Sequence, residues 1–171
     1  MNAPAALTPD QWFNQQHALY LAGTLGKNTY FDVGTFSGAP GFPSHRIFMP
    51  QGVVHKACVK HGLTSAHFNN FPSSVAAHHA AYISKTEDNS IVLRVTLGVS
   101  EWHSVPMERC IHPAFGTIYL IKSVYERTEE LFARHDAQGL QLYKRPPSPH
   151  TSQATLFVSS VQELGLPQST K

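Results

Sequence analysis

Residues 71–99 read FPSSVAAHHAAYISKTEDNSIVLRVTLGV and contain the pattern that decides the fold. Ser73 suits the N-cap of a helix, because its hydroxyl can accept a hydrogen bond from an unpaired N–H group of the first turn. From Val75 to Ile83, apolar and histidine side chains recur at helical spacing, which predicts a helix. After a polar break, apolar residues alternate over residues 91–99 as in a half-buried strand. The sequence therefore predicts a helix that packs on the strand after it.

Signals on either side of this unit predict further helices and strands. Thr8, Pro9 and Gln11 form a capping box with proline at the first helical position, and Gly26 is the expected end of that helix. The other expected elements are a strand over 28–36, a loop rich in glycine and proline over 37–44, a strand over 45–49, a helix over 53–58 closed by Gly62, an extended segment over 63–70, an irregular segment over 100–115, a long helix over 116–135 whose first half also reads as a strand, an extended segment over 140–143 and a last strand over 154–161.

The length and composition fit one folded domain. The chain has 171 residues, of which 42% are hydrophobic, and a domain of this size buries roughly two-thirds of its unfolded surface. With the order of elements, this predicts a single α+β domain over residues 1–171, in which three or four helices flank a twisted, mostly antiparallel sheet. We expect residues 1–7 and 166–171 to be flexible tails.

The charged residues are few, and their distribution argues against a nucleic-acid partner. They make up 14% of the chain, and the formal net charge is +2 without any run of Lys or Arg. A protein that binds nucleic acid normally presents a basic patch, so we expect no such partner. The chain is instead rich in histidine, with 11 residues, and an unperturbed imidazole is mostly neutral at pH 7.

The cysteines and the N-terminus bear on location. Cys58 and Cys110 form no CxxC motif, so we expect free thiols rather than a disulfide framework. The first residues lack the basic start and apolar stretch of a signal peptide, and no segment has the ~18 consecutive apolar residues of a membrane span. These features predict a soluble protein with no membrane partner, located in the cytoplasm or exported without a cleaved signal peptide, as a toxin or effector would be.

The first candidate binding group is His45 with Arg46, directly after the loop rich in glycine. The chain has no GxGxxG, GxxxxGK[ST], GxSxG or HExxH motif, so the usual dinucleotide, phosphate, hydrolase and zinc-protease signatures are absent. A guanidinium beside a glycine turn can hold a phosphate or carboxylate through two parallel hydrogen bonds. The alternative is a surface arginine in an ordinary ion pair, and such pairs are common and weak.

The second candidate binding group combines Ser73 and Ser74 with His78 and His79. Backbone N–H groups at a helix start attract anions, and serine hydroxyls add further donors. The alternative interpretation is a helix cap. Adjacent histidines on a helix point about 100° apart, so one of them is expected to be buried with its ring nitrogens satisfied.

The third candidate group lies in residues 100–115 and supplies Glu101, His103, Glu108 and His112. A carboxylate close to an imidazole can transfer protons as a general acid or base. The same residue types also bind zinc, but the spacing HxxxxExxxH is not a recognised metal motif. We therefore assign Glu101, Glu108 and His103 as catalytic candidates and expect no bound metal. Cys110, which follows an arginine, is a further reactive candidate in principle.

The order of these pieces resembles the mono-ADP-ribosyltransferases, which use NAD. In that family an early strand carries His or Arg, a helix ends in Gly followed by an aromatic residue or Leu, and a Ser-rich strand end leads into an Ala-rich helix and an apolar strand. The resemblance covers about a third of the chain and is one of pattern. The matching pieces are His45-Arg46, Gly62-Leu63, Ser73-Ser74, 76–82 and 91–99.

The resemblance implies that NAD binds across a cleft of the domain. Arg46 would hold its phosphates, Ser73 would support the nicotinamide ribose, and a glutamate would orient the acceptor. The Glu-x-Glu motif often found in the family is absent here, so Glu101, Glu108 and Glu163 are alternative substitutes. Stabilisation of a developing oxocarbenium ion would then be the main catalytic effect, as in other glycosyl transfers.

Three functions therefore stay open from the sequence, and it does not decide whether the protein is an enzyme. The first is an NAD-using transferase or glycohydrolase, with a nucleotide or small molecule as ligand and a protein as a conceivable acceptor. The second is a non-catalytic binding module for a protein partner or a small ligand. The third is a metal-dependent hydrolase that uses His and Glu. The oligomeric state is not indicated by the sequence.

Overall fold

An eight-stranded sheet organises the part of the chain that the computed structural model describes, residues 6–98 and 101–145, with Glu101 described by its backbone alone. The strand order is β1-β2-β6-β5-β4-β3-β8, and β7 pairs with β5 outside this path. Only the β2–β6 pair is parallel among the described strands. The elements are α1 (Pro9–Leu21), β1 (Tyr30–Phe36), β2 (His45–Pro50), α2 (Gln51–His61), α3 (Ser65–Phe68), α4 (Phe71–Ala76), β3 (Ala80–Ile83), β4 (Ser90–Leu97), β5 (Glu101–His112), β6 (Gly116–Ile121), β7 (Tyr125–Glu126), α5 (Glu129–Ala137) and β8 (Gln141–Lys144).

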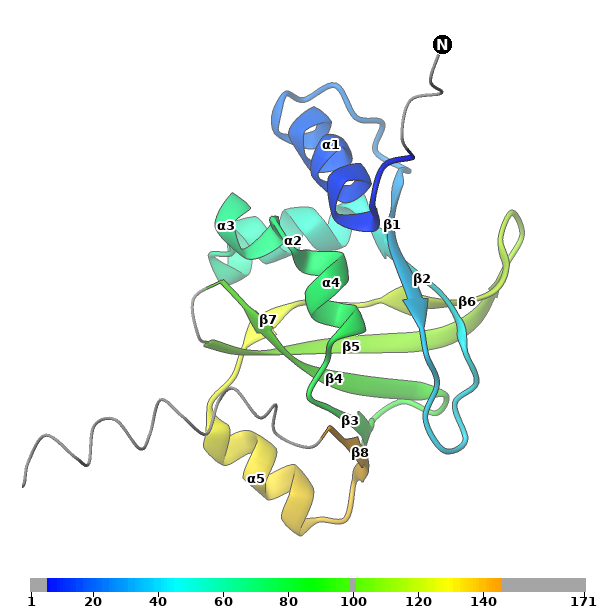
Figure 1. Ribbon diagram of the computed structural model, residues 1–171, viewed down its shortest axis with the longest axis vertical. Helices are drawn as coiled ribbons and strands as arrows, with labels where there is room; N and C mark the ends of the chain where they lie inside the picture. The colour runs from blue at the N-terminus through cyan, green and yellow to red at the C-terminus, as the bar shows by residue number, and fades with distance from the viewer. Residues whose placement is uncertain (1–5, 99–100, 146–171) are drawn as a thin grey trace, which may run out of the picture.

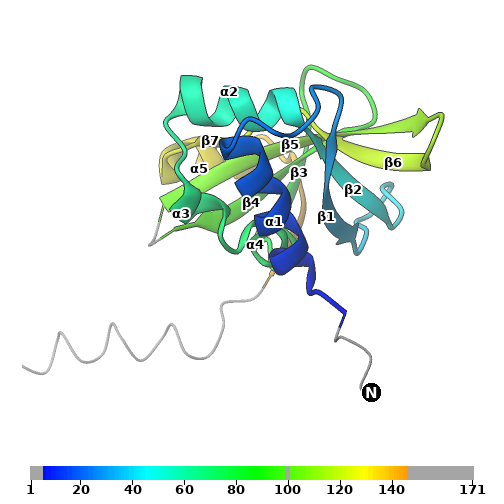
Figure 2. The same ribbon diagram turned by 90° about the horizontal axis from the view of Figure 1, so that it is seen from above.

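Helices cover the twisted sheet on both faces, unequally. Helices α1 and α4 lie over one face and α5 lies over the other, whereas α2 lies beside β2 and β7 with its C-terminal end on the side of α5 (Figures 1 and 2). The main core lies under α1 to α4, where Phe13 of α1 packs against Phe31, Phe68 and Phe71. The expected α+β class with a mostly antiparallel sheet is confirmed. None of the described helices is long and apolar enough to cross a membrane.

The first helix begins as its sequence predicts. Thr8 and Gln11 form the reciprocal capping box, in which the Thr8 hydroxyl accepts the Gln11 N–H at 3.2 Å. Phe13 and His17 are buried on the core side of α1. The helix ends at Leu21 rather than at Gly26, because Gly23, with a φ of 71°, already reverses the chain.

The second helix ends at the predicted glycine, but the segment after it differs from expectation. Gly62 adopts a left-handed conformation with a φ of 68° and closes α2. Residues 63–70 do not extend; they contain the short helix α3. Its capping box uses an unexpected residue, since the His67 side chain accepts the Thr64 N–H at 3.0 Å. The capping-box motif was not recognised in the sequence, because its last position normally holds Glu or Gln and here holds His67.

The predicted helix through Ile83 is wrong. Helix α4 ends at Ala76, and Ala80–Ile83 forms the strand β3. Two neighbours explain the difference: β4 pairs with β3 on one side and β8 pairs with it on the other, so its backbone groups are satisfied in a sheet. The apolar alternation of β4 itself is confirmed.

The irregular segment predicted over 100–115 is also wrong. It contains β5, which pairs with β4 along most of its length and with β6 and β7 on its other edge. Pro106 argues against a strand in the sequence, because proline has no N–H for the sheet. It is tolerated here because it lies between the part of β5 that pairs with β6 and the part that pairs with β7. The strand alternative for 116–121 is confirmed, and only α5 is helical in the second half. The strand expected over 154–161 lies outside the described residues.

Candidate functional site

Arg46 and His45 lie on β2, and both side chains have partners within the chain. The Arg46 guanidinium donates to Asp32 Oδ2 at 2.6 Å, across the antiparallel pair of β1 and β2. It also lies over the Phe48 ring, 4.7 Å from the centroid. The His45 ring packs near Tyr119. These contacts correspond to the ordinary ion pair that was the alternative interpretation for this group.

Ser73 and Ser74 lie inside α4 rather than at its start. The N-cap is Asn70. The Ser73 N–H donates to Asp10 Oδ1 at 2.9 Å, and its hydroxyl donates to Oδ2 of the same carboxylate. Because Asp10 belongs to the first turn of α1, these bonds join α1 to α4. The carboxylate that holds Ser73 takes up the donors that an anionic ligand would need.

The two histidines beside these serines are both partnered. His78 is buried with its Nδ1 within 2.9 Å of the Val75 carbonyl oxygen. His79 is exposed, and its Nε2 lies 3.1 Å from the Thr96 hydroxyl. The expectation that one of the pair is buried is therefore confirmed, although the segment that carries His79 is not helical.

The catalytic candidates on β5 are divided between the two faces of the sheet. His103 is 1% exposed and packs against the His67 ring on the side of α1 to α4. Successive side chains of a strand point to opposite faces, so Glu108, five residues after His103, lies on the other face of the sheet. Its carboxylate accepts from Lys122 Nζ at 2.7 Å. Glu101 pairs with Leu97 through its backbone. The structure thus does not bring Glu108 and His103 together.

A cleft of about 820 Å³ lies on the α5 face of the sheet, and none of the site residues predicted from the sequence lines it. Its floor is made by β4 and β5, where Val92 lies opposite Pro106. Ser90 and Ser104 complete the floor with small polar side chains. These residues alternate with buried core residues such as Val105, so the same strands form the main core on one face and the cleft on the other.

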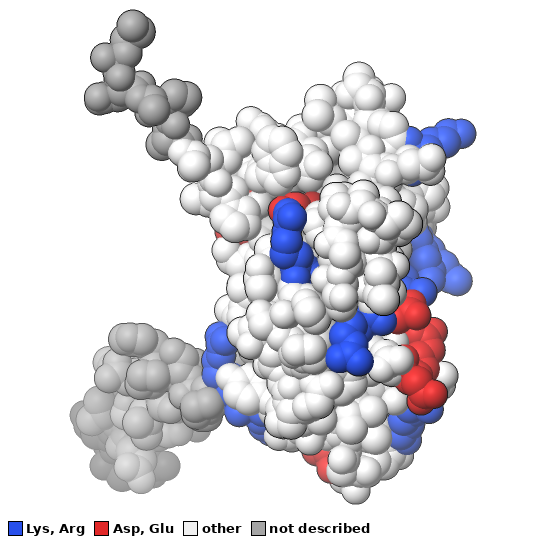
Figure 3. Space-filling view, turned by 90° about the vertical axis from the view of Figure 1, so that its right-hand side faces the viewer, with Lys and Arg blue, Asp and Glu red and all other residues white. Residues whose placement is uncertain are grey.

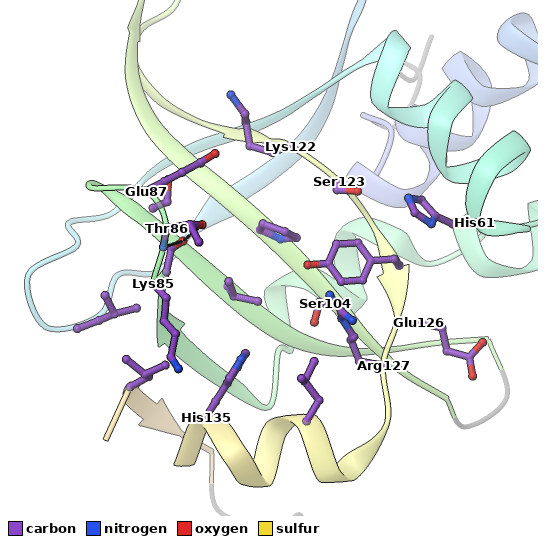
Figure 4. A pocket seen from close by; sticks show the side chains of 18 of the residues that line it. His61, Lys85, Thr86, Glu87, Ser104, Lys122, Ser123, Glu126, Arg127 and His135 are labelled. Atoms are coloured by element: carbon purple, nitrogen blue, oxygen red, sulfur yellow. Dashed lines mark hydrogen bonds between the residues drawn. The ribbon is translucent and has the colours of Figure 1, made fainter. Parts of the chain in front are cut away.

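A break between β6 and β7 forms one wall of the cleft. Ile121 still pairs with Met107, but the following residues leave the edge of β5 before β7 rejoins it. The Lys122 N–H donates to the Pro106 carbonyl at 2.9 Å, and Pro106 has no N–H to return. Lys122 and Ser123 consequently lie at the rim, as Figure 4 shows.

The other walls come from three separate segments. The turn between β3 and β4 supplies Lys85 and Glu87, the end of α2 supplies His61, and α5 supplies Leu131 and His135. In Figure 4 the labelled side chains of these segments surround one hollow. Helix α5 is held on the sheet by a second, smaller apolar cluster of Ala80, Tyr82 and Phe132, and by an ion pair between Arg94 and Glu129.

Four of the five Lys and Arg side chains that line the cleft lack an acidic partner in the described part of the chain, and the fifth, Lys122, is paired with Glu108. Lys56, Lys60, Lys85 and Arg127 line it, and none of them forms a salt bridge within the described residues. Arg127 lies over the Tyr125 ring at 4.2 Å from the centroid. The acidic lining residues are Glu87, which accepts from the Ser90 hydroxyl at 3.2 Å, and Glu126. The charge of the cleft is thus predominantly positive.

His61, at the end of α2, lies in a positive environment. Burial lowers the pKa of its imidazole, and the cations of Lys56, Lys60 and Arg127 lower it further. Its Nε2 is shielded from solvent without a hydrogen-bond partner. The ring also lies 5.7 Å from that of Tyr125. The pKa of His61 therefore lies below its usual value, and a bound anion would favour its protonation.

His135, on α5, lies in a similar environment. Burial lowers its pKa first, and the charges of Lys85 and Arg127 lower it further, with a smaller opposite effect from Asp136. Its Nδ1 is shielded from solvent and has no partner. Two imidazoles and several cations therefore line one cleft, an arrangement that can hold negative charge through charge-assisted hydrogen bonds.

Comparisons with family models, with curated proteins and with solved structures find no match to the chain. Within the described residues, no three His, Cys, Asp or Glu side chains are grouped so that they could hold a metal ion. Sequence analysis missed the cleft because its cations come from α2, the β3–β4 turn and the β7 segment. The one local signal is the pair Lys56 and Lys60, four residues apart on one helix face.

Proposed function

We propose that this protein binds a small organic anion, of the phosphate-ester class, in the cleft between the sheet and α5. The observation that carries the proposal is the set of four cations, Lys56, Lys60, Lys85 and Arg127, that line one concave site without an acidic partner. Positive charge in a cleft with low-dielectric walls attracts and concentrates anions. Guanidinium and ammonium groups are also the usual donors to phosphate oxygens.

The size and surroundings of the site support a small ligand rather than a polymer. A cavity of about 820 Å³ is within the ~300–1,000 Å³ range of small-molecule sites. Val92 and Leu131 add apolar lining that suits the organic part of a ligand. Outside the cleft, the face in Figure 3 is mostly uncharged, with a few basic and acidic side chains, which is unlike the continuous basic surface that tracks a nucleic-acid backbone.

Titration calorimetry with AMP, ADP and NAD at low salt tests the proposal. We expect binding to the wild-type protein that weakens as salt is added, because salt screens the charges. Arg127→Gln should weaken binding about tenfold, since loss of one charge-assisted contact of ~1.4 kcal/mol corresponds to that factor. The matched control is Arg46→Gln, which removes the same charge outside the cleft. Equal affinities of both variants would contradict the proposal.

Transfer of ADP-ribose from NAD remains a prediction within the same ligand class. It requires a carboxylate beside the bound nicotinamide ribose. Glu87 and Glu126 line the cleft, whereas the candidate Glu108 is engaged by Lys122. Release of nicotinamide from NAD would support an enzyme. If NAD binding were lost in Arg46→Ala and kept in Arg127→Ala, the site implied by the family resemblance would replace the cleft.

A further inference from the structure

Apart from Arg127, the cations of the cleft that form no salt bridge within the described residues fall into two groups on opposite walls. One group comes from α2, where Lys56 and Lys60 lie four residues apart, about 6 Å on one helix face. The other comes from the β3–β4 turn, which supplies Lys85. Figure 4 shows His61 of the first wall and Lys85 of the second at opposite sides of the hollow. A histidine lies beside each group: His61 follows Lys60 on α2, and His135 of α5 lies near Lys85 (Figure 4).

Arg127 lies between the two groups. In Figure 4 its side chain is drawn between His61 and Lys85. Its charge acts on both imidazoles, since it contributes to the lowered pKa of His61 and of His135. The α2 lysines contribute to the lowered pKa of His61, and Lys85 contributes to that of His135. Arg127 is therefore close to both groups.

The floor of the cleft carries no charged side chain. Val92, Pro106, Ser90 and Ser104 form it, Leu131 of α5 also lines the cleft, and the Tyr125 ring lies against Arg127. A single phosphate would fill only a small part of a cavity of about 820 Å³. A ligand that fills the cleft would thus have an uncharged body in the middle and negative charge at both ends.

From this arrangement we infer that the cleft has two anion subsites, and that its ligand is a small molecule with two phosphate groups separated by an uncharged body. The inference rests on the proposed function and narrows its ligand class. One phosphate contacts Lys56 and Lys60 of α2, and the other contacts Lys85 near His135. Arg127 contributes to both subsites.

The experiment compares three adenosine nucleotides as probes. AMP carries one phosphate group, ADP carries two adjacent ones, and adenosine 3′,5′-bisphosphate carries two that are separated by the ribose. Calorimetry should find the 3′,5′-bisphosphate at least tenfold tighter than AMP and several-fold tighter than ADP. Fructose 1,6-bisphosphate against fructose 6-phosphate repeats the comparison without a base.

Variants assign the two subsites. Lys60→Gln and Lys85→Gln should each reduce the advantage of the 3′,5′-bisphosphate over AMP several-fold, and Arg127→Gln should weaken all probes. All three side chains are exposed, so folding is expected to be preserved. Lys144→Gln, on β8 and outside the cleft, is the matched control and should leave the affinities unchanged.

The outcomes separate the two levels of the proposal. If none of the five probes binds, the proposed function itself fails. If the probes bind but ADP and the 3′,5′-bisphosphate have equal affinity, the cleft holds phosphate without two subsites. Loss of the bisphosphate advantage in Lys144→Gln would also overturn the inference, since it would show that only the total charge of the protein matters.

Discussion

Two residues predicted to bind a ligand, one on β2 and one on α4, carry polar groups similar to those that line the cleft, but these two have acidic partners and most cations of the cleft do not. Arg46 donates to Asp32 of β1, and Ser73 donates to Asp10 of α1. In the cleft, Lys85 and Arg127 form no salt bridge within the described residues. A paired cation has to leave its carboxylate before it can hold a ligand, and an unpaired one does not. The candidate site is therefore distinguished by cations that are free to bind a ligand, and not by the types of residue that it contains.

Removing the unpaired charges gives the largest expected effect. The triple variant Lys60→Gln, Lys85→Gln and Arg127→Gln should bind the best phosphate-ester probe about 1,000-fold more weakly, if each lost contact contributes ~1.4 kcal/mol. Calorimetry at fixed ionic strength measures the loss.

The control for this experiment removes an equal charge from other places. The triple variant Lys27→Gln, Arg46→Gln and Lys144→Gln lies outside the cleft and should lose less than about threefold, because screening weakens distant charges. If the two triple variants lost the same affinity, the distinction between paired and unpaired regions would have no functional meaning.

Ser73 should contribute to stability and not to binding. Ser73→Ala removes the hydroxyl that donates to Asp10, so the free energy of unfolding should fall by about 1–2 kcal/mol. This is the lower part of the ~1.5–3 kcal/mol range for hydrogen bonds to charged groups, because the pair is exposed to water. Urea unfolding measures the change. Ser74→Ala is the matched control on the same helix, since no side-chain hydrogen bond of Ser74 is seen within the described residues. If Ser73→Ala bound phosphate esters more weakly than the wild-type protein, Ser73 would have to be part of the binding site.

The cleft histidines predict how stability and binding depend on pH. Burial lowers the pKa of both His61 and His135 in the folded protein. The unfolded state therefore binds more protons once the pH falls below about 6.5, so the ligand-free protein loses stability from that pH down through the folded pKa.

The same titration should have the opposite effect on binding. A bound anion favours the protonated imidazoles, so the affinity for NAD should rise as the pH falls from 7 toward 5. NAD is the probe for this test because its phosphates keep their charge over this range, whereas a phosphate monoester takes up a proton near pH ~6. Thermal unfolding with and without the probe measures both effects. In the double variant His61→Gln and His135→Gln, both pH effects should shrink. An affinity that stays constant over this range would show that the imidazoles do not face the ligand.

The smallest effect is expected at Arg46. Its ion pair with Asp32 is half-exposed, and such pairs contribute ~0.2–1 kcal/mol. Arg46→Gln should therefore change the free energy of unfolding by less than about 1 kcal/mol and leave phosphate-ester binding intact. A double-mutant cycle with Asp32→Asn isolates the pair, and a coupling energy well above this range would place Arg46 in a more important structural role.

The parts of the fold that the sequence predicted correctly have local signals. The capping box at Thr8, the terminating Gly62 and the period-2 pattern of β4 each depend on residues close in the chain. The parts that failed depend on distant partners. Residues Ala80–Ile83 form a strand because β8 pairs with them, and β5 tolerates Pro106 because two different strands share its edge.

The site could not be predicted for the same reason. Arg46 and Ser73 looked available in the sequence, and their acidic partners lie 14 and 63 residues away. Lys85 directly precedes the polar break over 86–90, and its place on a cleft wall depends on β3 being a strand rather than a helix. A single sequence shows which charged residues are present, whereas only the folded structure shows which of them form ion pairs with one another.

The alternation along β5 has a consequence for how this cleft can change. Val105 lies in the main core, and its neighbours Ser104 and Pro106 lie in the cleft floor. The depth of the cleft therefore comes from small side chains that take no part in the main core. Replacing Ser104 with a longer polar residue should therefore change which ligand the cleft prefers, while the main core stays the same. The floor is thus a suitable place to begin a redesign of the site.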